Sequence, residues 1–531
     1  MKQTENIVSV SLSNCLKECL KLAQRHKLKE ISDTLFQVLD NLDSPMQLAI
    51  IGKISSSKST MVNAILGNDN IVEMGHKETT YNVSWLKYGS SDADVKVVFK
   101  DGRCEFVPRN KWKEWAGQSD NKLKDSVKYI EVTYDDEMLK DVNIIDTPGL
   151  DSTKGIDSKN TIDFLKDVRP DALMMVFTHG LAKTTMDVVR EFQGEQANKM
   201  LLSPLNAIGV LSKIDKLWSF NKKVQPLEHA QKEIIEGNIY HLFPEVRESL
   251  FGIIPLCAML GLASQTLTQQ DIDLLKVLSK TEEGNLSKMF MDADLFKKGS
   301  FNVGISFEDR EYLESKFGRY GVWELIGFMQ QSNDDVESVK RHLREISGFD
   351  NLCKCLYSHF GQRSYLIKTQ SIHHVIAQAC DEQRKIVKTD AEKQMVDFIQ
   401  EQILVTLMGI FEYEQLDYLS KLYEGTMDIK DQQAVEEYKR VCGEYGNSVI
   451  SRMNMSRDES IDAMCNEAKK RAQSASKKAT LSRMSKPQDS DLYRMISRSY
   501  SHLAQRIDEM REKKDDAEKI IKITNEFFYG E

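Results

Sequence analysis

The chain has 531 residues, which is too long for one compact core and predicts two or three domains. Lysine and arginine number 72 against 81 aspartates and glutamates, and the formal net charge of -9 argues against a general nucleic-acid-binding protein. No apolar run approaches the length of a membrane span, and the first residues lack the pattern of an export signal. We therefore expect a cytoplasmic protein whose scattered cysteines are reduced and mostly buried.

Proline placement divides the chain. Eight of the nine prolines lie from Pro45 to Pro255, and the next is Pro487. Because proline breaks helix interiors, the long proline-free tract, rich in Lys, Glu, Gln, Leu and Met, predicts long helices. The sequence thus indicates an α/β block between two helical arms.

Both arms carry apolar stripes at spacings of three and four residues. The first arm, from about residue 9 to residue 42, has its stripe at Leu28, Ile31, Leu35, Val38 and Leu42. The last arm has Leu492, Ile496, Tyr500, Leu503, Ile507 and Met510, continued by Ala517 and Ile521. We expect both ends to pack with the helices from about residue 364 onward in one elongated helical bundle, a stalk built from both termini.

The central block alternates short apolar runs with helical stretches, as a mixed sheet flanked by helices requires. The expected strands are 47–52, 96–99, 129–134, 142–146, 172–177, 207–211 and 252–256, with a hairpin turn at Asp101-Gly102. We divide the chain into an N-terminal helix (1–45), an α/β domain (46–262), a helical connector (263–363) and a C-terminal helical bundle (364–531) whose tip lies near 474–490.

The segment from Gly52 to Thr60, GKISSSKST, follows an apolar strand and precedes a helical stretch. Such a loop directs backbone N–H groups and a helix N-terminus toward phosphate, so we expect Lys58 to reach the β- and γ-phosphates and Ser59 to ligate Mg2+. Ser57 replaces the usual glycine, and we expect its Cβ to crowd the phosphate. A Ser-rich turn is the alternative interpretation. The expected nucleotide contacts in the loop are Gly52, Lys53, Ser55, Ser56, Ser57, Lys58, Ser59 and Thr60.

Asp146-Thr-Pro-Gly149 closes the expected strand 142–146. A carboxylate at this place suits the water shell of Mg2+, while the Gly149 N–H is placed to sense the γ-phosphate. A bare DTPG is often only a turn. Between the loop and this motif, Thr79 and Thr80 are candidates to ligate Mg2+ and position water, and we prefer Thr80 on its order along the chain.

Ser212-Lys-Ile-Asp215 follows the expected strand 207–211. We expect Asp215 to accept bidentate hydrogen bonds from guanine N1 and N2, and the stem of Lys213 to cover the base. Ser212 stands where Asn or Thr is usual, so we expect weaker bridging to the rest of the site. Cys257 and Ala258 fit the last base-contacting element, although a buried strand end explains them equally.

Four motifs in this order, each at a strand end on one side of the sheet, predict a guanine-nucleotide site. Asp215 disfavours an ATPase of another P-loop class.

On these residues the chain resembles bacterial dynamin-like GTPases, especially the labile-enterotoxin-output and isoniazid-inducible members. The resemblance rests on the helical segment before the α/β domain, Ser55 in the loop, the double threonine, DTPG without a following glutamine, SKID and the helical C-terminal half. The segment from Gly348 to Lys368 is also similar to that family. Motif similarity covers roughly residues 46–262, and elsewhere only the architecture matches.

The resemblance implies GTP hydrolysis without an arginine finger or a catalytic glutamine. Catalytic roles then fall to Ser55, Lys58, Thr79 and Thr80, and Mg2+ ligation to Ser59, Thr80 and Asp146. Ser55, a monovalent cation and Mg2+ would offset charge between the β- and γ-phosphates, and Thr80 would hold the attacking water. Because Ser57 and Ser212 depart from the pattern, a weak or pseudo-GTPase is the alternative.

The resemblance further implies self-association through GTPase domains, pairing with a related GTPase as an alternative, and a stalk that swings with nucleotide state to remodel or tether membrane. Contact would be peripheral, with anionic lipid at the inner face of a membrane. The residues offer a basic tip, with a solvated inter-helix loop as its alternative interpretation, and a second candidate at 403–411 that is more typical of bundle core. The tip combines Leu481 and Met484 with Lys469, Lys470, Arg471, Lys477, Lys478, Arg483 and Lys486. The rival hypothesis is a soluble GTP-binding regulatory or scaffold protein whose helical half docks a protein partner.

Overall fold

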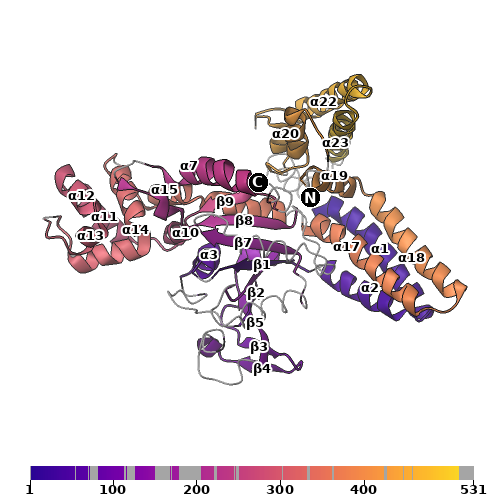
Figure 1. The fold of residues 1–531 in the computed structure, drawn as a ribbon, viewed down its shortest axis with the longest axis horizontal. Helices are drawn as coiled ribbons and strands as arrows, with labels where there is room; N and C mark the ends of the chain where they lie inside the picture. Colours follow the sequence, from indigo (N-terminus) through magenta and orange to yellow (C-terminus); the bar gives the residue numbers. More distant parts are fainter. Residues whose placement is uncertain are drawn as a thin grey trace. The chain divides into compact units, whose positions relative to one another are not determined.

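The computed structural model describes residues 2–512 apart from residues 43, 54, 70, 72–81, 113–114, 116–125, 150–167, 169, 179–204, 221–223, 244–245, 247–249, 302, 332–334, 362–363, 424–426, 447 and 457. Thr79, Thr80, Ala517 and Ile521 therefore lie outside the described residues. The chain forms two compact units, both drawn in Figure 1. The sheet unit comprises Met46–Tyr357, and the helical unit comprises Met1–Pro45 and Ser358–Glu531.

The sheet unit is built on a nine-stranded mixed sheet with the order β4-β3-β5-β2-β6-β1-β7-β8-β9. Neighbours from β6 to β9 in this order are parallel, whereas β2 is antiparallel to β6 and parallel to β5, and β3 is antiparallel to both β4 and β5. The strands are β1 Met46–Gly52, β2 Ser84–Tyr88, β3 Val95–Phe99, β4 Cys104–Val107, β5 Val127–Tyr134, β6 Val142–Asp146, β7 Ala172–Thr178, β8 Ala207–Ser212 and β9 Ile253–Leu256. The predicted mixed sheet is confirmed.

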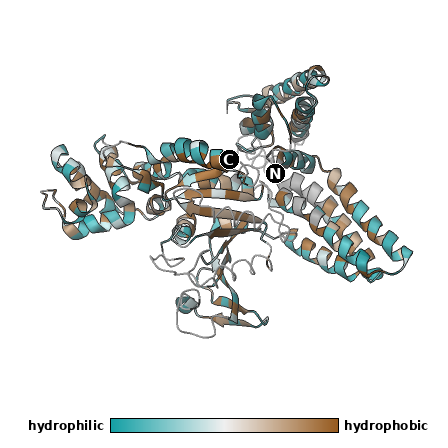
Figure 2. Cartoon of the chain, viewed as in Figure 1, coloured by the Kyte–Doolittle hydropathy of each residue, from teal (hydrophilic) through white to brown (hydrophobic). Residues whose placement is uncertain are grey.

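Every expected strand coincides with an observed one, and the hairpin at Asp101-Gly102 joins β3 to β4, with Gly102 at φ 89°. The strand β2 was not predicted. Its sequence SWLKY is not bounded by turn residues on both sides, and its pairing with β5 and β6 makes it a strand. Figure 2 shows the hydrophobic central strands and the mixed character of the helices.

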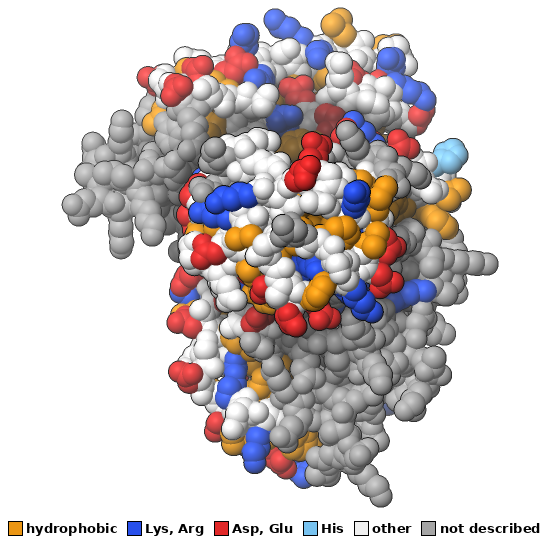
Figure 3. Space-filling model, turned by 90° about the vertical axis from the view of Figure 1, so that its left-hand side faces the viewer, with side chains coloured by type: hydrophobic (Ala, Val, Ile, Leu, Met, Phe, Trp, Pro, Cys, Tyr) orange, Lys and Arg blue, Asp and Glu red, His pale blue; other side chains and the backbone are white. Residues whose placement is uncertain are grey.

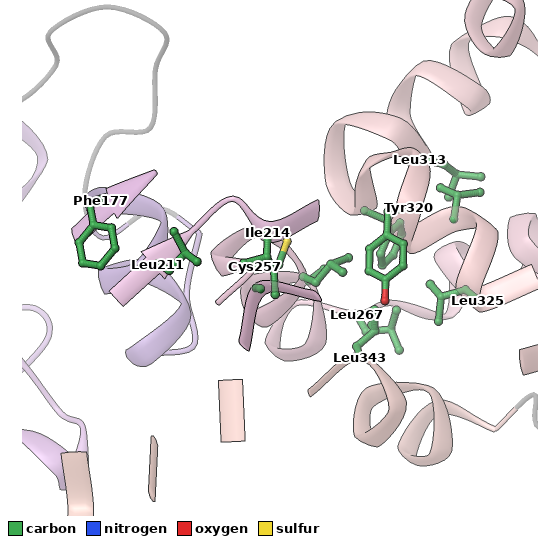
Figure 4. Close-up of a cluster of buried hydrophobic side chains, with 14 of the residues drawn as sticks. Phe177, Leu211, Ile214, Cys257, Leu267, Leu313, Tyr320, Leu325 and Leu343 are labelled. Carbon is green, nitrogen blue, oxygen red and sulfur yellow. The ribbon is translucent and has the colours of Figure 1, made fainter. Parts of the chain in front are cut away.

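Most helices of the sheet unit, α3 and α16 apart, share one hydrophobic core with the strands. Figure 4 shows Phe177 and Leu211 from the strands, Leu313 and Tyr320 from α14, and Leu343 from α15 within this core. The helices are α3 Lys58–Ile65, α7 Pro226–His229, η7 Ala230–Ile239, α8 Tyr240–Leu242, α10 Ala258–Gln265, α11 Gln269–Ser279, α12 Glu283–Phe290, α13 Ala293–Lys298, α14 Phe307–Met329, α15 Val336–Ser347 and α16 Phe349–Lys354, with short turns η1 Arg109–Lys111, η3 Glu137–Lys140 and η5 Ile214–Leu217. Most of the expected connector, residues 263–357, thus belongs to the same compact unit as the sheet.

Figure 3 looks onto the end of the sheet unit formed by α11 to α14. Hydrophobic side chains are interspersed there with acidic and basic ones. Met291, Leu295 and Phe307 are exposed in this region. The mixture of both charge signs makes this end an ordinary solvated surface.

The N-terminal arm consists of two helices instead of the single helix that we expected. α1 Lys2–Arg25 ends before α2 Lys29–Leu42, and Lys27 between them has a left-handed φ of 56°. This break folds α2 back against α1. The predicted apolar stripe is correct, since Leu28, Ile31 and Leu35 are fully buried or nearly so.

The other helices of the helical unit are α17 Ser364–Ile386, α18 Asp390–Met408, α19 Phe411–Tyr423, α20 Gln432–Val441, α21 Val449–Met453, α22 Ile461–Ser482 and α23 Pro487–Glu512, and η8 Cys355–Gly361 precedes them. The first group, α1, α2, α17 and α18, shares one core. α23 packs mainly against α22 and α20. Both ends of the chain therefore contribute to the helical unit, but to different groups of helices. No described helix has the length and hydropathy needed to cross a bilayer.

Lys368 on α17 forms hydrogen bonds with the backbone at the C-terminal end of α2. Its Nζ donates hydrogen bonds to the carbonyl oxygens of Asn41 (2.7 Å), Ser44 (2.6 Å) and Pro45 (3.3 Å), and its side chain is buried. The last carbonyls of a helix have no partner within the helix, so the buried ammonium satisfies groups that would otherwise be orphaned.

Replacing Lys368 with Met should destabilise this junction. Met keeps the apolar stem but leaves the carbonyls without a donor, so we expect the local free energy of opening to fall by roughly 2 kcal/mol. Hydrogen exchange of the α2 amides should accelerate accordingly. Lys385→Met, at an exposed position of the same helix, should leave the exchange of α2 unchanged. Equal exchange in both variants would contradict the role of Lys368.

Candidate nucleotide site

The predicted motifs meet at one edge of the sheet. Because β6, β1, β7, β8 and β9 are parallel, their carboxyl ends lie together, which is where α/β sheets bind ligands. Gly52 ends β1, Asp146 ends β6, Ser212 ends β8 and Cys257 directly follows β9. The structure thus gathers the loop, DTPG and SKID, while the binding roles of their residues stay predictions.

Gly52 is required by the close approach of β1 to β7. A Cβ at this position would lie 2.2 Å from the carbonyl oxygen of Val176, a backbone atom that cannot swing away. On the other side of β1, the Thr147 hydroxyl donates to the Ile50 carbonyl oxygen at 2.7 Å. The start of the loop is therefore held from both neighbouring strands.

The loop contains two left-handed serines. Ser55 has a φ of 59° and Ser57 a φ of 69°, and α3 begins at the next residue, Lys58. Right-handed and left-handed backbone conformations in alternation point successive N–H groups to one side, and these groups form an anion-binding concavity. The left-handed conformation costs a non-glycine residue roughly 1–2 kcal/mol. The departure from glycine at Ser57 is therefore a conformational strain, in addition to any crowding of phosphate.

Lys58 is buried, and its Nζ donates to the carbonyl oxygens of Gly52 (2.9 Å) and Lys53 (3.1 Å). Burial lowers the pKa of Lys58 to about 8, and the charge of Asp146 opposes this shift. The ammonium is thus held within the loop by weak acceptors. Phosphate oxygens would be stronger partners for it.

Asp146 is fully buried, and neither of its carboxylate oxygens has a hydrogen-bond partner among the described residues. Burial raises the pKa of Asp146 to about 6, and the charge of Lys58 opposes this shift. A buried carboxylate without donors is costly, and a hydrated cation would relieve it. Ser59, the residue predicted as a second oxygen ligand, lies in the first turn of α3 at this edge. These residues fit Mg2+, which takes few protein ligands and keeps several waters.

The site contains no cluster of three or more His, Cys, Asp or Glu side chains suited to a metal, as far as the described residues go.

Ser212 joins the base element to the phosphate loop. Its hydroxyl donates to the Ser56 carbonyl oxygen at 2.7 Å, and its side chain is buried. The short serine therefore spans the distance, contrary to the weaker bridging that we expected from the sequence.

Asp215 lies in the short turn η5, which follows the left-handed Lys213 (φ 58°). Its Oδ1 accepts a hydrogen bond from the Cys257 thiol at 3.4 Å. Burial, together with the charge of Asp215, raises the pKa of that thiol well above its usual range. Cys257 thus contacts the carboxylate expected to bind guanine, and Ala258 begins α10 beside it. The sequence predicted Cys257 as a base contact but not its bond to Asp215.

Gly149 is the last described residue of DTPG and is partly buried, and Thr79 and Thr80 lie outside the described residues. The arrangement that can be described is a phosphate loop, a buried carboxylate and the aspartate that we predicted to bind guanine, all at one edge of a largely parallel sheet. This combination defines a P-loop nucleotide-binding domain of the GTPase type.

Comparisons with known proteins extend this assignment. Residues 48–214 match the model of the Dynamin family. The isoniazid-induced protein IniC of Mycobacterium tuberculosis is 23% identical over 428 residues, which cover 80% of this chain and 83% of that protein. Dynamin-like protein 2 of Campylobacter jejuni is 28% identical over 224 residues, 41% of this chain and 35% of that protein. The predicted resemblance to bacterial dynamin-like GTPases is confirmed, and residues 48–214 form a domain of the Dynamin family.

A solved structure of an oligomerised bacterial dynamin pair also matches. It is 15% identical, with 99% of this chain and 97% of that chain covered, and the TM-score is 0.35. This likeness is too weak to add to the sequence matches.

Affinity for GDP in the presence of Mg2+ should be highest between pH 6 and pH 8. The pKa of about 8 for Lys58 means that its ammonium is lost at higher pH, which weakens phosphate binding. The pKa of about 6 for Asp146 means that the carboxylate is protonated at lower pH, which weakens metal binding. Titration calorimetry from below pH 6 to above pH 8 measures the fall in GDP affinity on the acid side and on the alkaline side.

The same titration in EDTA provides the control. The acid limb is the fall in GDP affinity below pH 6. Without metal, the part of this fall that is due to protonation of Asp146 should vanish, whereas the part due to protonation of GDP itself remains with and without metal. The alkaline limb should persist. An acid limb of equal size with and without Mg2+ would contradict the assignment of Asp146.

Proposed function

We propose that the chain binds GTP with Mg2+ and hydrolyses it in a dynamin-type cycle. The observation that carries this proposal is the fully buried Asp146, whose carboxylate oxygens have no partner among the described residues, within electrostatic range of Lys58. Such a pair is unfavourable by itself and is suited to a phosphate–metal ligand.

The residues of the site would have different roles in binding the nucleotide and the metal. Lys58 would exchange the carbonyls of Gly52 and Lys53 for phosphate oxygens, and Ser59 and Asp146 would hold the metal. When bound, Mg2+ would neutralise charge on the β- and γ-phosphates. Asp215 would select guanine, with Ser212 tying that element to the loop.

The remaining roles come from the resemblance. Thr80, or Thr79, would position water, Gly149 would sense the γ-phosphate, and Ser55 would act with a monovalent cation. The remaining loop contacts are those of Ser56, Ser57 and Thr60, and Ala258 would lie near the base.

Two substitutions test the nucleotide assignment. Lys58→Ala should weaken GDP binding on the order of 100-fold, because a buried cation partner of the phosphates is lost. Asp215→Asn should lower the preference for guanine and raise that for xanthine, whose 2-oxo group accepts from the new amide. Fluorescent-nucleotide titrations measure both.

Asp273→Asn, an exposed carboxylate on α11, is the matched control and should leave binding unchanged. Unaltered preference for GDP over ADP in Asp215→Asn would overturn the guanine assignment, and full affinity in Lys58→Ala would overturn the phosphate loop.

We further propose that paired GTPase domains and the helical unit act at a membrane surface from the cytoplasmic side. The turn between α22 and α23 supports this: Leu481 is 82% exposed and Met484 is 95% exposed. Lys477 and Arg483 beside them have no acidic partner in the described part of the chain. Basic and apolar side chains together suit anionic headgroups, at about 1 kcal/mol per charge.

The other basic residues of this tip are engaged elsewhere. Lys469 pairs with Asp508 (2.7 Å), and Lys486 lies 3.8 Å from Asp489. The second candidate, 403–411, behaves mainly as bundle core, because Ile403, Leu407 and Ile410 are buried. The exposed turn is therefore the better candidate for lipid contact.

A double variant, Leu481→Ser with Met484→Ser, should lose most binding to phosphatidylglycerol vesicles in a sedimentation assay, because the apolar contact with the membrane is removed. The basic residues of the tip are unchanged in this variant. Val405→Ser with Met408→Ser is the matched control, since these side chains on α18 are 61% and 58% exposed. The control should bind like the unmodified chain. Loss of binding in the α18 variant alone would place the lipid contact there.

A second candidate function is a soluble GTP-binding regulatory or scaffold protein, with a related GTPase as a possible hetero-partner. The strained Ser57 favours it, because a distorted phosphate loop slows turnover more readily than it abolishes binding. Turnover that rises with protein concentration and with anionic vesicles supports the first function. Binding without either response supports the second.

A further inference from the structure

Ser84, the first residue of β2, is a buried polar residue without an evident structural purpose. Its side chain is fully buried, and its Oγ has no hydrogen-bond partner among the described residues. Leaving a buried hydroxyl unpaired costs roughly 1–3 kcal/mol. A strand residue with only a packing role would be apolar here.

The strand register places Ser84 directly opposite Asp146. β2 runs antiparallel to β6, and the paired residues are Ser84 with Asp146 and Leu86 with Ile144. Residues directly opposite in an antiparallel pair project from the same face, with Cβ atoms roughly 4.5–5.5 Å apart. The hydroxyl of Ser84 therefore shares its face with the carboxylate of Asp146.

The side chains next to the Ser84 hydroxyl and the Asp146 carboxylate on this face are apolar. The next pair on that face, Leu86 and Ile144, is fully buried and apolar. Because β2 begins where β6 ends, Ser84 stands at the nucleotide edge of the sheet. Among the described residues at this edge, the Ser84 hydroxyl, the Ser56 hydroxyl and both carboxylate oxygens of Asp146 are buried without a hydrogen-bond partner.

Two other buried serines of this unit have backbone partners, whereas the Ser56 hydroxyl in the phosphate loop, like that of Ser84, has none among the described residues. Ser264 is also buried, and its hydroxyl donates to the Gly261 carbonyl oxygen at 2.6 Å on its own helix. Ser212 donates to Ser56. Ser84 differs from both, since it has no such acceptor among the described residues.

We propose that Ser84 is a positioning residue of the Mg2+ site, whose hydroxyl holds the water shell of the ion together with Asp146. This inference rests on the proposed function. Groups behind the direct ligands orient carboxylates and waters, and their loss typically weakens metal binding 10- to 100-fold.

The test measures metal affinity through nucleotide binding and not through turnover. Fluorescent GDP is titrated over a range of free Mg2+, and the Mg2+ concentration at half-maximal enhancement of affinity is determined. In Ser84→Ala this midpoint should rise about tenfold, while GDP affinity in EDTA stays unchanged. Removing an unpaired buried hydroxyl should not harm folding.

Two further variants complete the experiment. Ser84→Thr keeps the hydroxyl on a β-branched side chain suited to a strand, and its midpoint should stay near that of the unmodified chain. Ser264→Ala removes a buried serine away from the site, and it should leave the midpoint unchanged.

Three outcomes would overturn the inference: an unchanged midpoint in Ser84→Ala, an equal loss of GDP affinity in EDTA, or a threonine variant that behaves like the alanine variant. The proposed function fails separately, if GDP affinity of the unmodified chain does not respond to Mg2+ at all.

Discussion

The buried charges of Lys58 and Asp146 are the constraint on which the site depends. Each is driven toward its neutral form by burial, and each is held charged in part by the other. Two neighbouring strands fix the distance between them: β1 leads into the loop that carries Lys58, and β6 ends at Asp146. The sheet therefore buries a carboxylate that has no hydrogen-bond partner among the described residues near an ammonium bonded only to backbone carbonyls. A cation and a phosphate would be stronger partners for these two groups.

The base element depends on the helices as well as on the sheet. Asp215 accepts from Cys257, and the backbone N–H of Cys257 donates to Ser347 at the end of α15 (2.8 Å). A few residues later, the ring of Trp218 lies 6.1 Å from that of Tyr320 on α14. The turn that carries Asp215 is thus packed directly against the helices that follow the sheet in sequence. This explains why those helices share one core with the strands and form no separate connector unit.

The sequence predicted the strands that carry motifs because long apolar runs in a buried parallel sheet are visible without any knowledge of pairing. It also predicted the apolar stripe of α2 from its spacing. It missed β2, whose short sequence acquires its conformation from two neighbours, and it missed the break at Lys27, where a single left-handed residue turns one helix into two. Local patterns thus predicted burial well and also the Asp101-Gly102 hairpin, which has turn residues, but not the turn at Lys27, which has none.

By itself, the sequence determined the class of protein, because GKISSSKST, DTPG and SKID keep their order and their places at strand ends. Only the tertiary structure decided the conformation and surroundings of three serines near the site. Ser57 occupies a left-handed position, Ser212 reaches the carbonyl of Ser56, and Ser84 stands opposite Asp146. Each of these facts depends on backbone conformation or on strand register. Strand register brings residues that are far apart in the chain within a few ångströms of each other, and it is not encoded in a local run of residues.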